Sequence, residues 1–460
     1  MTTLPRPRTP RAAATPTPPT TPTRRRSRAA AAVTGVTLTG LLAADGSGHG
    51  SAHASGHRHP SVFRILGPGF VAAIAYVDPG NVAANLSAGA RYGYLLLWVL
   101  VVANLMAAVV QYLSAKLGLV TGRSLTAVLS DRLPRPTRWM YWAQAEVIVA
   151  ATDIAEVIGG AVALHLLFGT PLLLGGLIVG AVSVVLLLVQ GGRTQRRFEA
   201  VIVAFLVVIT LGFLSGLVVT GVDPAGMAAG LLPRFAGTDT VLLAASMLGA
   251  TVMPHAVYLH SGLVRDRRFT PHGDAGMRHH LRATKWDVGL ALLIAGTVNI
   301  AMLVLAAQAL RGVDGTDTID GAHRAVAEHL GTGVGVLFAV GLLASGLAST
   351  SVGCYAGDLV MKDLLRIRVP LVLRRVVTLV PALVLLVSGV EPTRALVVSQ
   401  VVLSIGLPFA LLPLVILTAR RTVMGRWVNP RSLTVVASVV CGVIVVLNIA
   451  LIWLTLTGRG

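Results

Sequence analysis

Long apolar blocks separated by short polar segments dominate the chain from residue 63 onward. The stretches 172–189 and 200–222, for example, contain no charged residue. About 20 apolar residues cross a bilayer core as a helix, and lipid requires backbone polar groups to pair within the protein. The pattern therefore predicts an all-α integral membrane protein, with the lipid bilayer as its surroundings.

Eleven such spans can be placed along the chain. The first ten form two sets of five, 65–221 and 240–419, and 433–457 is an additional helix. Because five is odd, the second set enters the membrane from the opposite side, which predicts an inverted repeat. The spans are 65–90, 94–120, 139–168, 171–190, 198–221, 240–263, 287–310, 331–357, 370–389, 394–419 and 433–457.

Residues 1–62 differ from the helical region 63–460. They are rich in Pro, Thr, Ala and Arg and then in Gly, His and Ser, a composition that predicts a disordered tail. Three arginines at 24–26 precede a mild apolar run at 29–44, as in a signal peptide. This run is rich in Ala, Thr and Gly, so a cytoplasmic tail is the favoured interpretation.

The charge of the chain follows its predicted topology. The net charge is +19, although only 12% of residues are charged, against about a quarter in soluble domains. With a cytoplasmic N-terminus, the inward loops hold 22 Lys and Arg residues and the outward segments hold six. This asymmetry predicts a multi-pass protein of the cell membrane with its C-terminus outside, and it argues against a nucleic-acid partner. The outward loop 311–330 carries four acidic residues and predicts a mouth that attracts cations weakly.

Two spans are interrupted at matching positions of the two sets. The first contains Asp78–Asn81, which reads Asp-Pro-Gly-Asn, and the sixth contains Met253–His255, which reads Met-Pro-His. Proline removes a backbone donor and clashes with the preceding turn, so both helices should unwind in mid-membrane. Paired interruptions in inverted halves indicate a central transport site, whereas two packing kinks are the alternative.

The side chains at these interruptions suit a transition-metal ion. Asp78 and Asn81 offer oxygen ligands, Met253 offers a thioether, and Gln400 in the tenth span could complete the shell. Sulfur gives no advantage for Ca²⁺ or Mg²⁺ but can bind Mn²⁺, Fe²⁺, Co²⁺ and Cd²⁺. Gln111 is a weaker candidate, because a lone glutamine usually bonds neighbouring helices.

A second group of polar residues lies in the third span. Glu146, Asp153 and Glu156 fall on one helical face, and Arg374 and Arg375 in the ninth span are candidate partners. Carboxylates inside a membrane form a proton path, part of a salt-bridge network, or both. The spacing of these residues agrees with both interpretations.

Two histidines follow the interruption of the sixth span. His255 is predicted to accept a proton at the site. His260 is a proton-relay candidate or a packing residue, and five residues separate it from His255, so the two do not form a metal-binding pair on one helical face.

The motifs at 78–81, 253–255, 144–146 and 152–156 resemble those of the Nramp family of divalent-metal transporters. The resemblance begins near Gly67 and continues to the C-terminus. It implies a LeuT-like fold with helices 1 and 6 unwound. It also implies a proton-coupled symporter that imports Mn²⁺ and related metals by alternating access, without a cofactor or an obligate protein partner. The presence of Met253 is typical of the transition-metal branch.

The resemblance also assigns roles to single residues. The metal ligands that it implies are Asp78, Asn81, Met253, the carbonyls of Ala75 and Ala250, and in some states Gln400. The residues that it implies for proton coupling are Asp78, Asp153, Glu156, His255 and Arg375.

Two other functions fit these residues less well than metal transport. A sodium-coupled amino-acid transporter on the same repeat fold would present helix N-termini and small residues to a carboxylate, and Asp78 and Met253 fit a cation better. A membrane metalloenzyme would need an open metal site with a base. The spans contain no His-Glu-x-x-His motif, and Cys354 and Cys441 are predicted to be small buried side chains, so an enzyme is not expected.

Overall fold

The computed structural model describes residues 67–189, 195–267 and 273–457. These residues lie within one compact unit, Arg58–Gly460, and the predicted tail 1–62 lies outside them. Every regular element in the described residues is a helix. The elements are α1 Pro68–Ala73, η2 Ile74–Val77, α2 Pro79–Tyr92, η3 Gly93–Leu96, α3 Leu97–Thr121, α4 Leu125–Ser130, α5 Arg135–Phe168, α6 Leu172–Val189, α7 Gln195–Thr220, α8 Pro224–Gly230, α9 Thr238–Thr251, α10 Pro254–Asp266, α11 Gly273–Ala309, α12 Ile319–Leu330, α13 Thr332–Leu365, α14 Leu371–Val387, α15 Pro392–Thr418, α16 Arg421–Met424, η5 Gly425–Trp427 and α17 Arg431–Leu456.

Each predicted span has a helical counterpart. Among the described residues, eight helical stretches are long and apolar enough to cross a membrane. One of them, Pro79–Thr121, contains parts of the first two predicted spans, which η3 joins. The predicted span 171–190 corresponds to α6, which is shorter than these eight stretches. The predicted span 370–389 corresponds to α14, which carries two arginines. The chain is therefore a multi-pass helical membrane protein.

Both predicted interruptions are confirmed. The first span is α1, then the 3-10 turn η2, then Asp78 in an extended conformation, then α2. The sixth span is α9, then Val252 and Met253 in non-helical conformations, then α10. Pro79 and Pro254 each occupy the first position of the helix that follows, where the missing N–H costs nothing.

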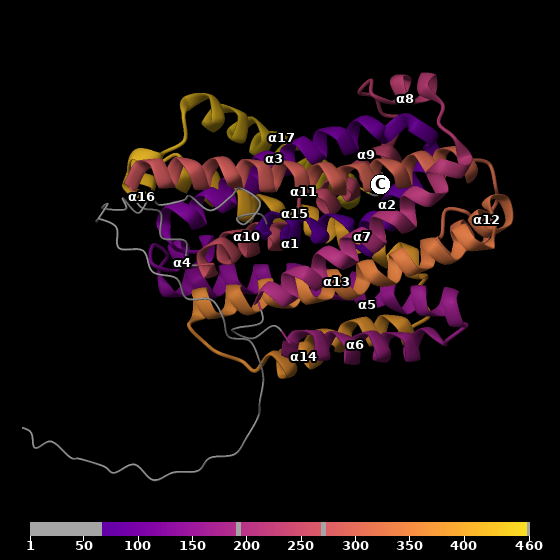
Figure 1. Ribbon diagram of the computed structural model, residues 1–460, viewed down its shortest axis with the longest axis horizontal. Helices are drawn as coiled ribbons and strands as arrows, with labels where there is room; N and C mark the ends of the chain where they lie inside the picture. The colour runs from indigo at the N-terminus through magenta and orange to yellow at the C-terminus, as the bar shows by residue number, and fades with distance from the viewer. Residues whose placement is uncertain (1–66, 190–194, 268–272, 458–460) are drawn as a thin grey trace, which may run out of the picture. The chain divides into compact units, whose positions relative to one another are not determined.

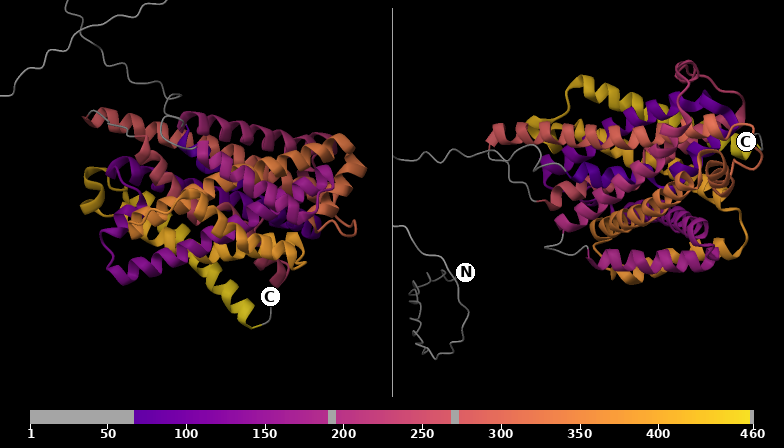
Figure 2. Two further views of the ribbon diagram at one scale, coloured as in Figure 1. Left: turned by 90° about the horizontal axis from the view of Figure 1, so that it is seen from below. Right: turned by 45° about the vertical axis from the view of Figure 1, so that its right-hand side comes forward.

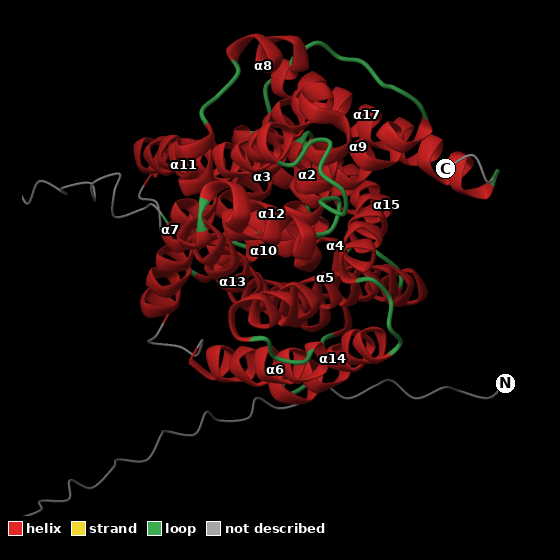
Figure 3. Cartoon of the chain, turned by 90° about the vertical axis from the view of Figure 1, so that its right-hand side faces the viewer, coloured by secondary structure: helices red, strands yellow, loops and turns green. Residues whose placement is uncertain are grey.

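The interruptions lie inside the bundle, between longer helices. α2 packs on α11, α15 and α9, while α5 packs along α13 and α15. α6 and α14 lie side by side on α5 and form one flank of the bundle (Figures 1 and 3). The last helix, α17, packs on α15 and α9 at the periphery (Figure 2). Figure 1 shows α8 and α12 at one end of the bundle and α4 and α16 at the other.

Candidate functional site

The two interruptions meet at Asp78 and Asn81. Asp78 is the N-cap of α2, and its Oδ1 accepts from the Asn81 backbone N–H at 2.8 Å and from Asn81 Nδ2 at 2.7 Å. The same Nδ2 donates to the backbone carbonyl of Ala250 at 2.8 Å. Because Ala250 lies three residues before Met253, this bond places the two interruptions side by side.

Two prolines free two backbone carbonyls at the site. In a continuous helix, the carbonyl of Ala75 would accept from the N–H of residue 79, and that of Ala250 from the N–H of residue 254. Both positions are proline and have no N–H to donate. These carbonyls are therefore available to another partner, and the Ala250 carbonyl already accepts from Asn81.

A third element, α15, brings Gln400 to the same place. Gln400 Nε2 donates to Asp78 Oδ2 at 3.2 Å. Gly80 makes this approach possible, because a Cβ atom at that position would overlap the Gln400 carboxamide. The glycine in Asp78–Asn81 therefore has a packing role that the sequence motif alone does not reveal.

The donor atoms left over at the site suit a cation. Asp78, Asn81, Met253 and Gln400 are all fully buried. The amide oxygens of Asn81 and Gln400 have no hydrogen-bond partner among the described protein atoms, although buried acceptors are normally paired. The described residues contain no group of three or more His, Cys, Asp or Glu side chains suited to a metal. A metal at this site would thus be held by one carboxylate and neutral oxygen and sulfur donors.

The predicted charge partners are confirmed at the flank formed by α14. Arg374 donates to Glu146 at 2.7 Å, and Arg375 lies 3.1 Å from Asp153. Arg375 and Asp153 are both fully buried, whereas Glu146 is partly exposed. Glu156 is fully buried, and neither carboxylate oxygen has a hydrogen-bond partner in the described part of the chain. Arg375 is therefore the charge partner of Asp153.

Glycines on α13 make room for these charged side chains. This role of the glycines was not predicted from the sequence. A Cβ at Gly357 would overlap the Arg374 guanidinium, and one at Gly353 would lie 3.2 Å from Glu156 Oε1. The neighbouring Cys354, predicted as a small buried side chain, is buried, and its Sγ lies 4.0 Å from Asp153 Oδ1. The sequence signal for this role is the spacing of Gly353 and Gly357, because residues four apart lie on one helical face.

The two histidines have different surroundings. His255 Nδ1 lies 3.2 Å from the hydroxyl of Thr152, so His255 contacts α5 one residue before Asp153 in the sequence. His260 Nδ1 donates to Gln111 Oε1 at 2.7 Å, and Gln111 Nε2 donates to the Tyr76 hydroxyl. Both ends of the Gln111 amide therefore bond neighbouring helices, which is the alternative to a place in the metal shell.

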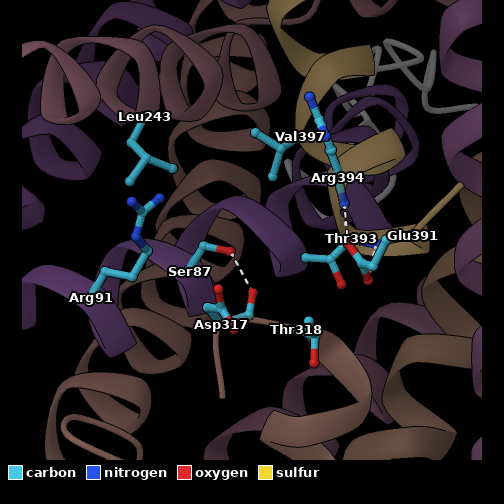
Figure 4. Close-up of a pocket in the computed structure, with 9 residues that line it drawn as sticks. All are labelled: Ser87, Arg91, Leu243, Asp317, Thr318, Glu391, Thr393, Arg394 and Val397. Carbon is cyan, nitrogen blue, oxygen red and sulfur yellow. Dashed lines mark hydrogen bonds between the residues drawn. The ribbon is translucent and has the colours of Figure 1, made fainter. Parts of the chain in front are cut away.

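A pocket of about 430 Å³ lies at the end of the bundle that carries α12 (Figure 4). Ser87 is nine residues beyond Asp78 on α2, and Val397 is one turn before Gln400, so the pocket lies above the site along both helices. The predicted acidic mouth is of mixed charge, because Arg91 and Arg394 line it together with the acidic residues. The lining residues are Ser87, Arg91, Leu243, Asp317, Thr318, Glu391, Thr393, Arg394 and Val397.

Residues 69–454 match the model of the Nramp family, described as natural resistance-associated macrophage protein-like. A divalent metal cation transporter of Mycobacterium tuberculosis is 59% identical over 394 residues, which cover 86% of this chain and 92% of the relative. The divalent metal cation transporter of Bacillus subtilis is 44% identical over 391 residues, 84% and 91% of the two chains.

Solved structures give the same assignment. A mutant form of the Eremococcus coleocola manganese transporter has a TM-score of 0.78 and 30% identity, and the match covers 85% of this chain and 87% of that one. Mhp1, a nucleobase-cation-symport-1 family transporter, has a TM-score of 0.55 at 16% identity, with 85% and 93% covered. The second likeness concerns the fold alone. Together they confirm the predicted LeuT-like fold class.

Proposed function

The chain belongs to the Nramp family, and from this membership and the site geometry we propose that it is a proton-coupled symporter. It imports Mn²⁺ and related divalent transition metals, namely Fe²⁺, Co²⁺ and Cd²⁺, by alternating access. Its family and relatives are metal transporters rather than enzymes. The metal is cargo and not a resident cofactor.

The donor set between the two interruptions carries the proposal. Asp78 supplies the one negative charge, and the amide oxygens of Asn81 and Gln400, which have no partner among the described protein atoms, can bind a cation. Carbonyls of Ala75 and Ala250 add neutral oxygens. Such a shell replaces the water that a divalent ion loses on entering the membrane, because each water oxygen is exchanged for a fixed protein dipole.

Met253 supplies the selectivity in this proposal. A thioether is a soft ligand that contributes to binding of transition metals and contributes little to Mg²⁺ or Ca²⁺. Met253 is fully buried at the N-cap of α10, so its sulfur is not solvated in competition with the ion.

The proton route runs from the site to α5. His255 and Thr152 connect the interruption to the neighbourhood of Asp153. Asp153 and Glu156 with the single guanidinium of Arg375 form a buried group with one excess negative charge, which can hold one proton. We assign Glu146 and Arg374 to the outlet of this route, because Glu146 is partly exposed, and His260 to a weaker relay beside Gln111.

The Lys and Arg distribution supports the orientation that we propose, with the N-terminus in the cytoplasm and the C-terminus outside. The end of the bundle with α4 and α16 then faces the cytoplasm, and the end with α8 and α12 faces outward (Figure 1). The pocket beside Asp317 is the outward approach to the site.

The test is Mn²⁺ uptake into proteoliposomes under an inward pH gradient. Wild-type protein should accumulate Mn²⁺ and acidify the lumen, and Asp78→Ala should abolish both. Asp274→Ala is a matched control, because Asp274 is partly exposed and pairs with Arg426 at the surface. Uptake that is equal in Asp78→Ala and wild type would overturn the site, and Mn²⁺ uptake without lumen acidification would overturn the proton coupling.

A further inference from the structure

Helix α1 is held at its start by a side chain from a distant helix. The carboxylate of Asp287 on α11 accepts from the backbone N–H of Gly67 at 2.9 Å and from that of Gly69 at 2.7 Å. Asp287 is 218 and 220 residues away along the chain and is 2% exposed. A buried carboxylate therefore uses both of its oxygens on one helix terminus.

This contact supplies what α1 lacks locally. The first N–H groups of any helix have no partner within it. Gly67 occupies the N-cap with a φ of 148°, and α1 has no side-chain cap of its own. A negative charge at this end is also favoured by the helix dipole. The glycine at 69 is required for the approach, because a Cβ there would lie 2.9 Å from Asp287 Cγ.

The other end of α1 leads directly into the candidate metal site. α1 has six residues and continues through η2, which contains Ala75, to the extended Asp78. A short helix between a fixed cap and a non-helical joint can rotate as a unit about that joint. The position of α1 therefore decides whether the site is covered on the side where α1 begins.

The structure has this side closed. Ala75, Asp78 and Met253 are fully buried, and Val71 and Ala72 on α1 are buried as well. Opening this side by movement of α1 requires the carboxylate to release both N–H groups. Charge-assisted hydrogen bonds of this type are among the stronger contacts in proteins, so their release contributes to the barrier.

We propose that Asp287 is a positioning residue for transport, which caps α1 while the site is closed and releases it when the site opens on that side. This inference rests on the proposed alternating-access function. It assigns to Asp287 a role through α1 and no contact with the metal or the proton.

The test is hydrogen–deuterium exchange of the full-length protein in nanodiscs, read on peptides covering residues 67–77. Asp287→Ala should speed exchange there by about tenfold or more, since it removes two charge-assisted bonds. Asp287→Asn, which keeps one acceptor oxygen, should give an intermediate rate. Gly69→Ala should act in the same direction, because its Cβ displaces the carboxylate.

Asp274→Asn is the matched control, since Asp274 lies on the same helix but pairs with Arg426 at the surface. Exchange at 67–77 that is unchanged in Asp287→Ala would overturn the proposal. An equal acceleration along α5 and α13 would also overturn it, because that pattern reports a general loss of folding stability.

Transport gives the second readout. In uptake assays with the same variants, Asp287→Ala should lower the maximal rate at least severalfold while Mn²⁺ binding to the purified protein changes less than about twofold, because no metal ligand is altered. A maximal rate equal to wild type would overturn the positioning role. Hydrogen–deuterium exchange is measured without Mn²⁺, so it tests the contact between Asp287 and α1 independently of transport. A wild-type protein that transports no Mn²⁺ would overturn the proposed function and leave the exchange result on this contact unaffected.

Discussion

At the residue scale, the candidate site depends on backbone hydrogen bonds that are lost and on side-chain hydrogen bonds that take their place. Pro79 and Pro254 remove the N–H groups that would occupy the carbonyls of Ala75 and Ala250. Asn81 then uses its Nδ2 twice, on Asp78 and on Ala250, and its oxygen has no partner in the part of the chain that the structure describes. The same motif therefore both breaks the helix and presents its donors.

We expect Met253→Ala to alter selectivity more than fold. Removing the thioether should weaken Mn²⁺ binding by roughly tenfold, comparable with the loss of a supporting group at a metal site, and raise the relative transport of Ca²⁺ and Mg²⁺. Calorimetry and competition uptake with these ions measure both effects. Met247→Ala, a buried methionine one and a half turns earlier in the sixth span, should reduce stability and leave the ion order unchanged. An unchanged ion order in Met253→Ala counts against the sulfur argument.

A second expectation concerns Gly80. In Gly80→Ala the new Cβ overlaps the Gln400 carboxamide, so Gln400 must leave Asp78, and Mn²⁺ affinity should fall by roughly tenfold or more, as for other displaced supporting groups. Isothermal titration of purified protein measures it. Gly289→Ala is the control, because a Cβ there meets nothing within 4 Å. Equal affinities in the two variants would show that Gln400 does not depend on Gly80.

At the element scale, the flank of α5, α13 and α14 carries the buried charges. α14 brings Arg374 and Arg375 to the carboxylates of α5. α13 tolerates these long side chains because it presents glycines to them. Both arginines of α14 are therefore paired inside the protein.

Arg375→Met should destabilise the protein by about 3–5 kcal/mol, because it leaves Asp153 charged and unpaired in the interior. Adding Asp153→Asn should recover much of this loss, since the uncompensated charge is removed. Thermal unfolding midpoints in detergent, compared across the single and double variants, measure the coupling. A double variant less stable than Arg375→Met alone would contradict a direct pair.

At the scale of the whole molecule, two sets of five helices place their interruptions at one level of the membrane. α12 and the pocket beside Asp317 lie at one end, and α4 and α16 lie at the other (Figure 1). Because the second set runs in the opposite sense, each interruption contributes one half-helix to either side. This arrangement suits a site that opens to each side in turn.

The orientation has a direct test in cells. We expect a membrane-impermeant thiol reagent to label Asp314→Cys in intact cells and to label Arg421→Cys only after permeabilisation, since positively charged loops stay in the cytoplasm. Both positions are exposed, whereas Cys354 and Cys441 are buried. The reverse labelling pattern would invert the proposed topology.

The sequence alone was sufficient for the spans, the two interruptions and most of the candidate donors. The reason is that lipid leaves few solutions: an apolar run of sufficient length must be a helix, and proline or a carboxylate within it must be compensated by protein. The one-face spacing of Glu146, Asp153 and Glu156 likewise pointed to partners on another helix, and Arg374 and Arg375 were the available cations.

Tertiary structure decided which atoms meet. Gln400 reaches Asp78, whereas Gln111, an equally polar residue in an apolar span, bonds Tyr76 and His260. The cap that Asp287 provides for α1 joins residues more than 200 positions apart. Local sequence patterns report the periodicity and composition of one helix. Contacts such as these depend on how helices that are far apart in the sequence pack together, and a local pattern does not encode that packing.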